Sequence, residues 1–71
     1  MAHRAPANWI ALPDGSEVLF GIGMVRPAHL GLFEAIVEER SIGFFRDVEG
    51  AKRALERQAR QIGLLPPLPE L

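Results

Sequence analysis

The alternation of apolar and polar residues predicts short strands in the first two thirds of the chain and a helix after them. A short strand is expected at 9–12, followed by a turn at 13–16, where proline fixes φ and Asp-Gly tolerates a tight reversal. The longest alternating segment, 17–26, predicts one continuous strand that Pro27 ends, because proline cannot donate to a ladder. Its bulky residues at alternate positions would face the core: Val18, Phe20, Ile22 and Met24.

The segment 30–39 alternates in the same way and predicts a further strand. Phe33, Ala35 and Val37 would face the core. A tight reversal at 39–41 would lead into a strand at 42–45. Together these segments predict an antiparallel meander of three principal strands plus the shorter strand that begins at Trp9.

An amphipathic helix of about four turns is predicted after Asp47, which is a good N-cap residue. Gly63 stands where a left-handed residue commonly ends a helix, and Leu64 can fold back on the last turn. The proline-rich segment 64–71 favours an extended polyproline conformation. The buried stripe of the helix would consist of Val48, Ala51, Leu55, Ala59 and Ile62.

These elements predict the α+β class, with an antiparallel sheet of three to four strands packed on one C-terminal α-helix. The expected organisation is a flexible N-terminal arm at 1–8, a single domain at 9–63 and the extended tail at 64–71. A chain of 71 residues buries only about 60% of its unfolded surface, so the core must be modest.

Composition restricts the classes of partner and compartment. Eight Lys and Arg against nine Asp and Glu give a formal net charge of -1 at pH 7, so the whole molecule does not attract a polyanion. No apolar run approaches the roughly 20 residues that cross a bilayer, and the N-terminal residues lack the apolar segment of a secretory signal. We therefore expect a soluble cytoplasmic protein without a membrane partner.

No residue pattern in the chain indicates catalysis. His3 and His29 lack a second metal ligand at helical or hairpin spacing, and the chain contains no cysteine. Glu34 and Glu38 would lie on one strand face, where a role in solubility or partner selection is favoured over acid–base chemistry. The expectation is a non-enzymatic protein without a metal or cofactor.

The segment Ile42-Gly43-Phe44-Phe45, with Glu49, Ala51 and Ala54 after it, resembles the last strand and helix of AP2-type and integrase arm-binding domains. The resemblance covers roughly the second half of the chain and implies a three-stranded sheet packed on one helix. In those families the sheet face turned away from the helix reads DNA through Arg and aromatic side chains. Here the residues expected on that face are apolar or acidic, which disfavours contact with phosphates.

This second, outward face of the sheet is the candidate binding surface. A contiguous apolar patch on a small soluble domain is typical of an interface, unless the N-terminal arm or the tail covers it. The hypothesis is therefore a small inhibitor or regulator that binds another protein or a second copy of itself; phage-encoded inhibitors of CRISPR effectors belong to this class. The outward set includes Leu19 and Val25, and the expected partner-binding residues are Leu32, Glu34, Ile36, Glu38, Ile42 and Phe44.

The alternative hypothesis is a nucleic-acid-binding module that uses a basic helix face. Glu49 and Arg53, like Glu56 and Arg60, have the i,i+4 spacing of ion pairs, which is typical of an ordinary solvated helix. The basic residues of this alternative site are Arg46, Lys52, Arg53, Arg57 and Arg60.

Overall fold

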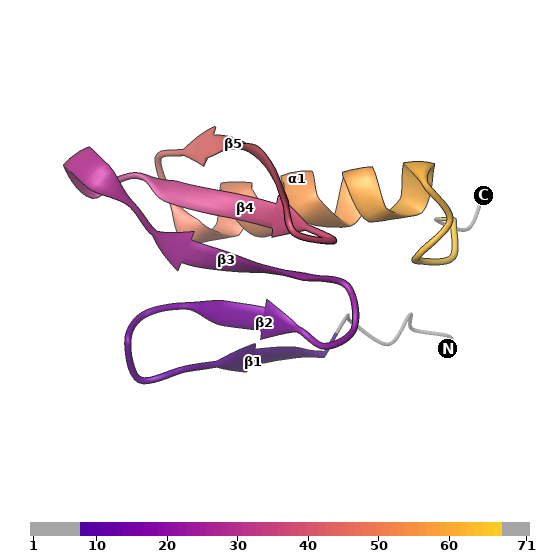
Figure 1. Ribbon diagram of the computed structural model, residues 1–71, viewed down its shortest axis with the longest axis horizontal. Helices are drawn as coiled ribbons and strands as arrows, with labels where there is room; N and C mark the ends of the chain where they lie inside the picture. The colour runs from indigo at the N-terminus through magenta and orange to yellow at the C-terminus, as the bar shows by residue number, and fades with distance from the viewer. Residues whose placement is uncertain (1–7, 68–71) are drawn as a thin grey trace, which may run out of the picture.

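A computed structural model describes residues 8–67 of the chain and shows one antiparallel sheet followed by one α-helix (Figure 1). The sheet has five strands in the order β1-β2-β3-β4-β5, so each strand pairs with its neighbour in sequence. The α+β class and the antiparallel meander are confirmed, whereas the expected number of three to four strands is wrong. The elements are β1 (Trp9–Ala11), β2 (Glu17–Leu19), β3 (Gly23–Pro27), the 3-10 turn η1 (His29–Gly31), β4 (Phe33–Val37), β5 (Arg40–Phe45) and α1 (Val48–Gln61).

The additional strand arises because the segment 17–26 is a hairpin. Gly21 adopts a left-handed φ of 78°, and the Ile22 N–H donates to the Leu19 carbonyl at 2.9 Å, which closes a turn between β2 and β3. Glycine adopts a left-handed φ without the steric cost that a side chain would bring. The prediction of one continuous strand is therefore wrong.

The core face of this hairpin is also the reverse of the one predicted. Leu19 and Val25 are buried, whereas Val18 and Met24 lie on the opposite face and Phe20 is 84% exposed. Ile22, which lies in the turn, packs against the core cluster as predicted. The helix α1 covers β3, β4 and β5 and lies behind them in Figure 1. Six buried residues form the centre of the core: Leu19, Val25, Ala35, Val37, Ala51 and Leu55.

Both ends of α1 form as predicted. The Asp47 side chain accepts a hydrogen bond from the Gly50 amide at 2.6 Å. At the other end Gly63 has a φ of 85°, and the amides of Gly63 and Leu64 donate to the carbonyls of Arg60 and Ala59, which is the Schellman pattern. Within the predicted stripe, Ala51, Leu55 and Ala59 are buried, whereas Val48 is half-buried and Ile62 is 47% exposed.

Polar contacts connect the β1–β2 hairpin to the helix. The Trp9 Nε1–H donates to Glu56 Oε2 at 2.7 Å, and the Lys52 ammonium donates to Glu17 Oε1 at 2.8 Å. The Lys52 Nζ also lies 5.3 Å from the centre of the Trp9 ring, within cation–π range. These contacts replace the expected helix pairs, since Glu56 binds Trp9 and Glu49 lies 3.6 Å from Lys52.

The domain extends slightly beyond its predicted end at Gly63. Leu64 and Leu65 pack against the core cluster. Most of the predicted N-terminal arm, residues 1–7, and the end of the tail, residues 68–71, lie outside the described residues. No helix within residues 8–67 is long and apolar enough to cross a membrane.

Candidate functional site: the outer sheet face

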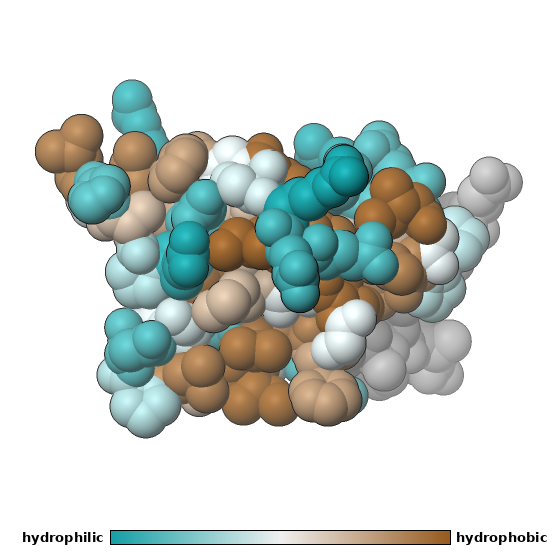
Figure 2. Space-filling view, viewed as in Figure 1, coloured by the Kyte–Doolittle hydropathy of each residue, from teal (hydrophilic) through white to brown (hydrophobic). Residues whose placement is uncertain are grey.

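The sheet face opposite α1, here called the outer face, carries an apolar row across four strands. Cross-strand pairing places Ile10 opposite Val18, Val18 opposite Met24, and Met24 opposite Ile36. Directly opposed residues point to the same face, so these four side chains are neighbours. Figure 2 views the outer face and shows hydrophobic residues gathered over β1 and β2, with hydrophilic residues more frequent over β4 and β5.

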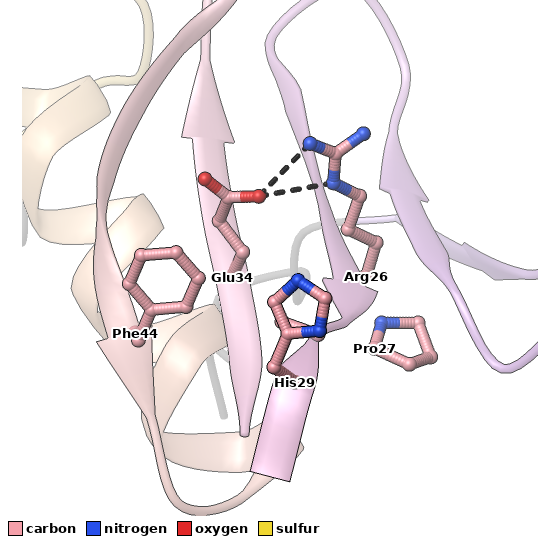
Figure 3. A pocket seen from close by; sticks show the side chains of 6 residues that line it. Arg26, Pro27, His29, Glu34 and Phe44 are labelled. Carbon is pink, nitrogen blue, oxygen red and sulfur yellow. Dashed lines mark hydrogen bonds and ion pairs between the residues drawn. The ribbon is translucent and has the colours of Figure 1, made fainter. Parts of the chain in front are cut away.

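A second row, with mixed polarity, crosses β3, β4 and β5. Arg26 lies opposite Glu34, and Glu34 lies opposite Phe44, which is 54% exposed. The Arg26 Nε and Nη2 groups donate to Glu34 Oε1 at 3.0 and 2.9 Å (Figure 3). The ion pair neutralises both charges. This row therefore presents the exposed ring of Phe44 beside an ion pair without net charge. A hollow of about 470 Å³ here is lined by Arg26, Pro27, Ala28, His29, Glu34 and Phe44.

The carboxyl of Glu34 titrates below its ordinary range. The Ser41 hydroxyl, and after it the Arg26 guanidinium, lower the pKa of Glu34 from its ordinary value of 4.5 by favouring the carboxylate. A group with a lowered folded-state pKa stabilises the fold above its unfolded pKa, and this contribution is lost as the pH falls through the folded value.

We therefore expect the stability difference between the native chain and Glu34→Gln to be constant above about pH 5.5. As the pH falls below about 4.5, the unfolded chain binds a proton at this carboxyl before the folded chain does, so the native chain should lose stability relative to the variant. Urea unfolding of both proteins between pH 3 and 7 measures this difference. A difference that does not change with pH would contradict the environment assigned to Glu34.

A second depression, here called the apolar hollow, opens where the β2–β3 and β4–β5 turns meet. Its volume is about 340 Å³. The Glu38 N–H donates to the Ile22 carbonyl at 3.1 Å, which holds the two turns together. Apolar side chains and glycine backbone form most of the hollow, and two carboxylates lie at its edge. The lining residues are Val18, Gly21, Ile22, Gly23, Met24, Ile36, Glu38 and Glu39.

The two carboxylates belong to a two-residue turn between β4 and β5, here called the acidic turn. Glu38 and Glu39 have φ values of 51° and 70°, and Val37 pairs with Arg40 on either side of them. Positive φ at both central residues defines a type I′ turn, for which Asn-Gly is the preferred sequence. The acidic turn is therefore built from residues that do not favour its backbone conformation.

Three of the predicted binding residues, Glu34, Ile36 and Phe44, lie on the outer face. Ile42 does not, because Ser41 pairs with Ile36 and Gly43 with Ala35, which leaves Ile42 as an extra residue that packs against the core. Its predicted outward position is wrong.

None of the remaining residues predicted to face outward lies at an outward position of a strand. Leu19 and Val25 are buried, so their outward assignment is wrong. Leu32 lies before β4, half-buried, and Glu38 lies in the acidic turn. The sequence interpretation missed the outward positions of Ile10, Val18 and Met24. The two glycines in the segment 17–26 were a signal for the hairpin, but they do not indicate which of its faces is turned outward.

The basic residues assigned to the alternative site lie in or just before α1. Lys52 is held by Glu17, and this hydrogen bond raises the pKa of Lys52 above its ordinary value of 10.5. Arg53, Arg57 and Arg60 recur at steps of four and three, so they form one stripe along the helix. Arg46 is exposed just before the helix N-cap.

The part of the chain that the structure describes contains no candidate metal site, since no three His, Cys, Asp or Glu side chains converge there. Comparison of the chain with protein-family models, with curated proteins and with solved structures found no match to any of them.

Proposed function

We propose that this chain is a protein-binding module that docks through its outer sheet face. The observation that carries the proposal is the apolar row, which spans four strands on the face that α1 leaves uncovered. Ile10 in this row is 51% exposed, and Phe44 in the neighbouring row is 54% exposed. Apolar side chains gathered on one face of a small domain are typical of interaction sites, where a few large ones supply most of the binding energy.

The proposed binding residues differ from those expected from the sequence. Ile10, Val18 and Met24 join Ile36 and Phe44, whereas Ile42 is removed because it packs in the core. The Arg26–Glu34 pair lies beside Phe44 in the second row and would fix the orientation of the partner. A face of this kind suits an inhibitor or regulator that occupies the surface of a larger complex, as phage-encoded inhibitors of CRISPR effectors do.

Two outer-face variants test this proposal. Met24→Lys places a charge in the apolar row, and Phe44→Ser removes an exposed ring, so each should reduce partner capture by about tenfold or more. The measurement is quantitative affinity capture from the native host, with chemical cross-linking to locate the contact. Ile62→Lys is the matched control, because Ile62 is similarly exposed but lies at the C-terminal end of α1.

Circular dichroism should show that each variant is folded. Undiminished capture by both folded outer-face variants would contradict the proposal.

The alternative, a nucleic-acid module, is favoured by Arg53, Arg57 and Arg60, which have no ion pair within residues 8–67. It requires an affinity for duplex DNA that falls steeply with salt, by a slope of about −0.9 for each phosphate contacted. The protein-binding proposal expects no measurable affinity of this kind.

A further inference from the structure

We propose that the apolar hollow receives an aliphatic side chain from a partner protein, and that lysine or arginine residues flank this side chain in the partner. This inference rests on the proposed function, because the hollow is part of the outer face. It adds the chemistry of the partner: an apolar anchor with positive charge on either side of it.

The shape and lining of the hollow support an apolar anchor. Val18, Met24 and Ile36 provide aliphatic surface, while Gly21 and Gly23 contribute backbone without side chains. The volume of about 340 Å³ lies at the lower end of the range for ligand pockets. Because the hollow opens onto the outer face and is not enclosed, a side chain carried by a protein surface fits it better than a free small molecule.

The charges around the hollow select a basic partner. Glu38 and Glu39 line it, and neither takes part in an ion pair within residues 8–67. Arg40 follows them but pairs with the core residue Val37, so its side chain points to the helix side of the sheet. Arg26 is bound to Glu34. The rim of the hollow therefore carries two uncompensated negative charges.

The backbone of the acidic turn supports a binding role for these carboxylates. A non-glycine residue at positive φ is energetically unfavourable, and such residues concentrate at ligand-contacting sites. Glu38 and Glu39 both adopt positive φ in a turn that Asn-Gly would form more easily. The two carboxylates are thus held beside the apolar hollow by a backbone conformation that is energetically unfavourable for glutamate.

The experiment is an NMR titration of the full ¹⁵N-labelled chain with two blocked peptides, Gly-Lys-Leu-Arg-Gly and Gly-Glu-Leu-Glu-Gly. The cationic peptide should shift the amides of Gly21, Gly23, Glu38 and Glu39, and added salt should weaken its binding. The anionic peptide has the same leucine but opposite charges, so it should bind at least about fivefold more weakly.

Single-charge variants identify the groups responsible. Glu38→Gln and Glu39→Gln should each weaken the cationic peptide about two- to fivefold, which is typical of an exposed ion pair. Glu49→Gln removes the same charge from a 71% exposed side chain on α1 and should leave the affinity unchanged.

The double variant Glu38→Asn/Glu39→Gly separates binding from folding. It introduces the sequence preferred in a type I′ turn, so the melting temperature should rise by several degrees while the cationic peptide is lost. A purely structural role for the two glutamates would not combine higher stability with weaker binding.

Three results would overturn the inference. Equal binding of both peptides at the hollow would remove the charge preference but leave the docking face in place. No shift at the hollow with either peptide would reject the hollow itself, while the proposed function would still be judged by the capture experiment. Shifts of the same amides on dilution of the protein alone would identify a second copy as the occupant.

Discussion

Leu55→Ala is expected to lower the free energy of unfolding by about 2–5 kcal/mol, as large-to-small changes in a core do. Leu55 is fully buried, and the other buried residues of α1, Ala51 and Ala59, are small. The helix therefore depends on one large side chain for its packing against the sheet. A chain of 71 residues has a total stability of only roughly 4–11 kcal/mol, so the variant should lose a large fraction of it.

Urea unfolding followed by circular dichroism measures this effect. Ile62→Ala is the matched control, because Ile62 lies about two helical turns beyond Leu55 but is 47% exposed. Its loss should change stability by no more than about 1 kcal/mol. Similar destabilisation by the two variants would contradict the core described here.

Gly23→Ala is expected to destabilise the fold by about 3 kcal/mol or more, although it adds only a methyl group. A Cβ atom at this position would overlap the backbone carbonyl of Ile36 and approach Leu55 Cδ1 to 3.2 Å. The obstacle is backbone of the adjacent strand, so relief requires β3 and β4 to separate. The β3–β4 pair lies at the centre of the sheet and directly under α1.

Gly21→Ala provides the comparison within the same hairpin. A Cβ atom on Gly21 would meet no atom within 4 Å, but its φ of 78° is unfavourable for alanine. The expected loss is about 1 kcal/mol. Thermal unfolding and amide spectra of both variants should show a much larger effect at Gly23, and equal losses would mean that the close approach of β3 and β4 is wrong.

The hairpin β2–β3 shows what an alternating pattern of residues can predict and what it cannot. A continuous strand and a hairpin with a three-residue turn place the same residues together, because Leu19 opposes Gly23 and the alternation continues across the turn. The division into two sets, one with Leu19 and Val25 and one with Val18 and Met24, was therefore predictable. Which set faces the core was not, since both are apolar.

The residues of the outer face were likewise predictable only in part. Glu34, Ile36 and Phe44 follow from simple alternation along β4 and β5. Ile42 does not, because a bulge shifts the register of this pair, and no local signal distinguishes its bulged position from an ordinary strand residue. The apolar hollow is also a product of tertiary structure, because it forms where two turns far apart in the sequence meet.

The sequence by itself determined the features that depend on neighbours along the chain: the meander, the Asp47 cap, the glycine that ends α1 and most of the helical stripe. These depend on hydrogen bonds and periodicity within a few residues. The tertiary structure decided which side of the sheet α1 covers, because burial depends on fit between distant surfaces. Gly23 has no side chain, so it leaves room for Leu55 on the helix side of the sheet. The apolar row lies on the outer face.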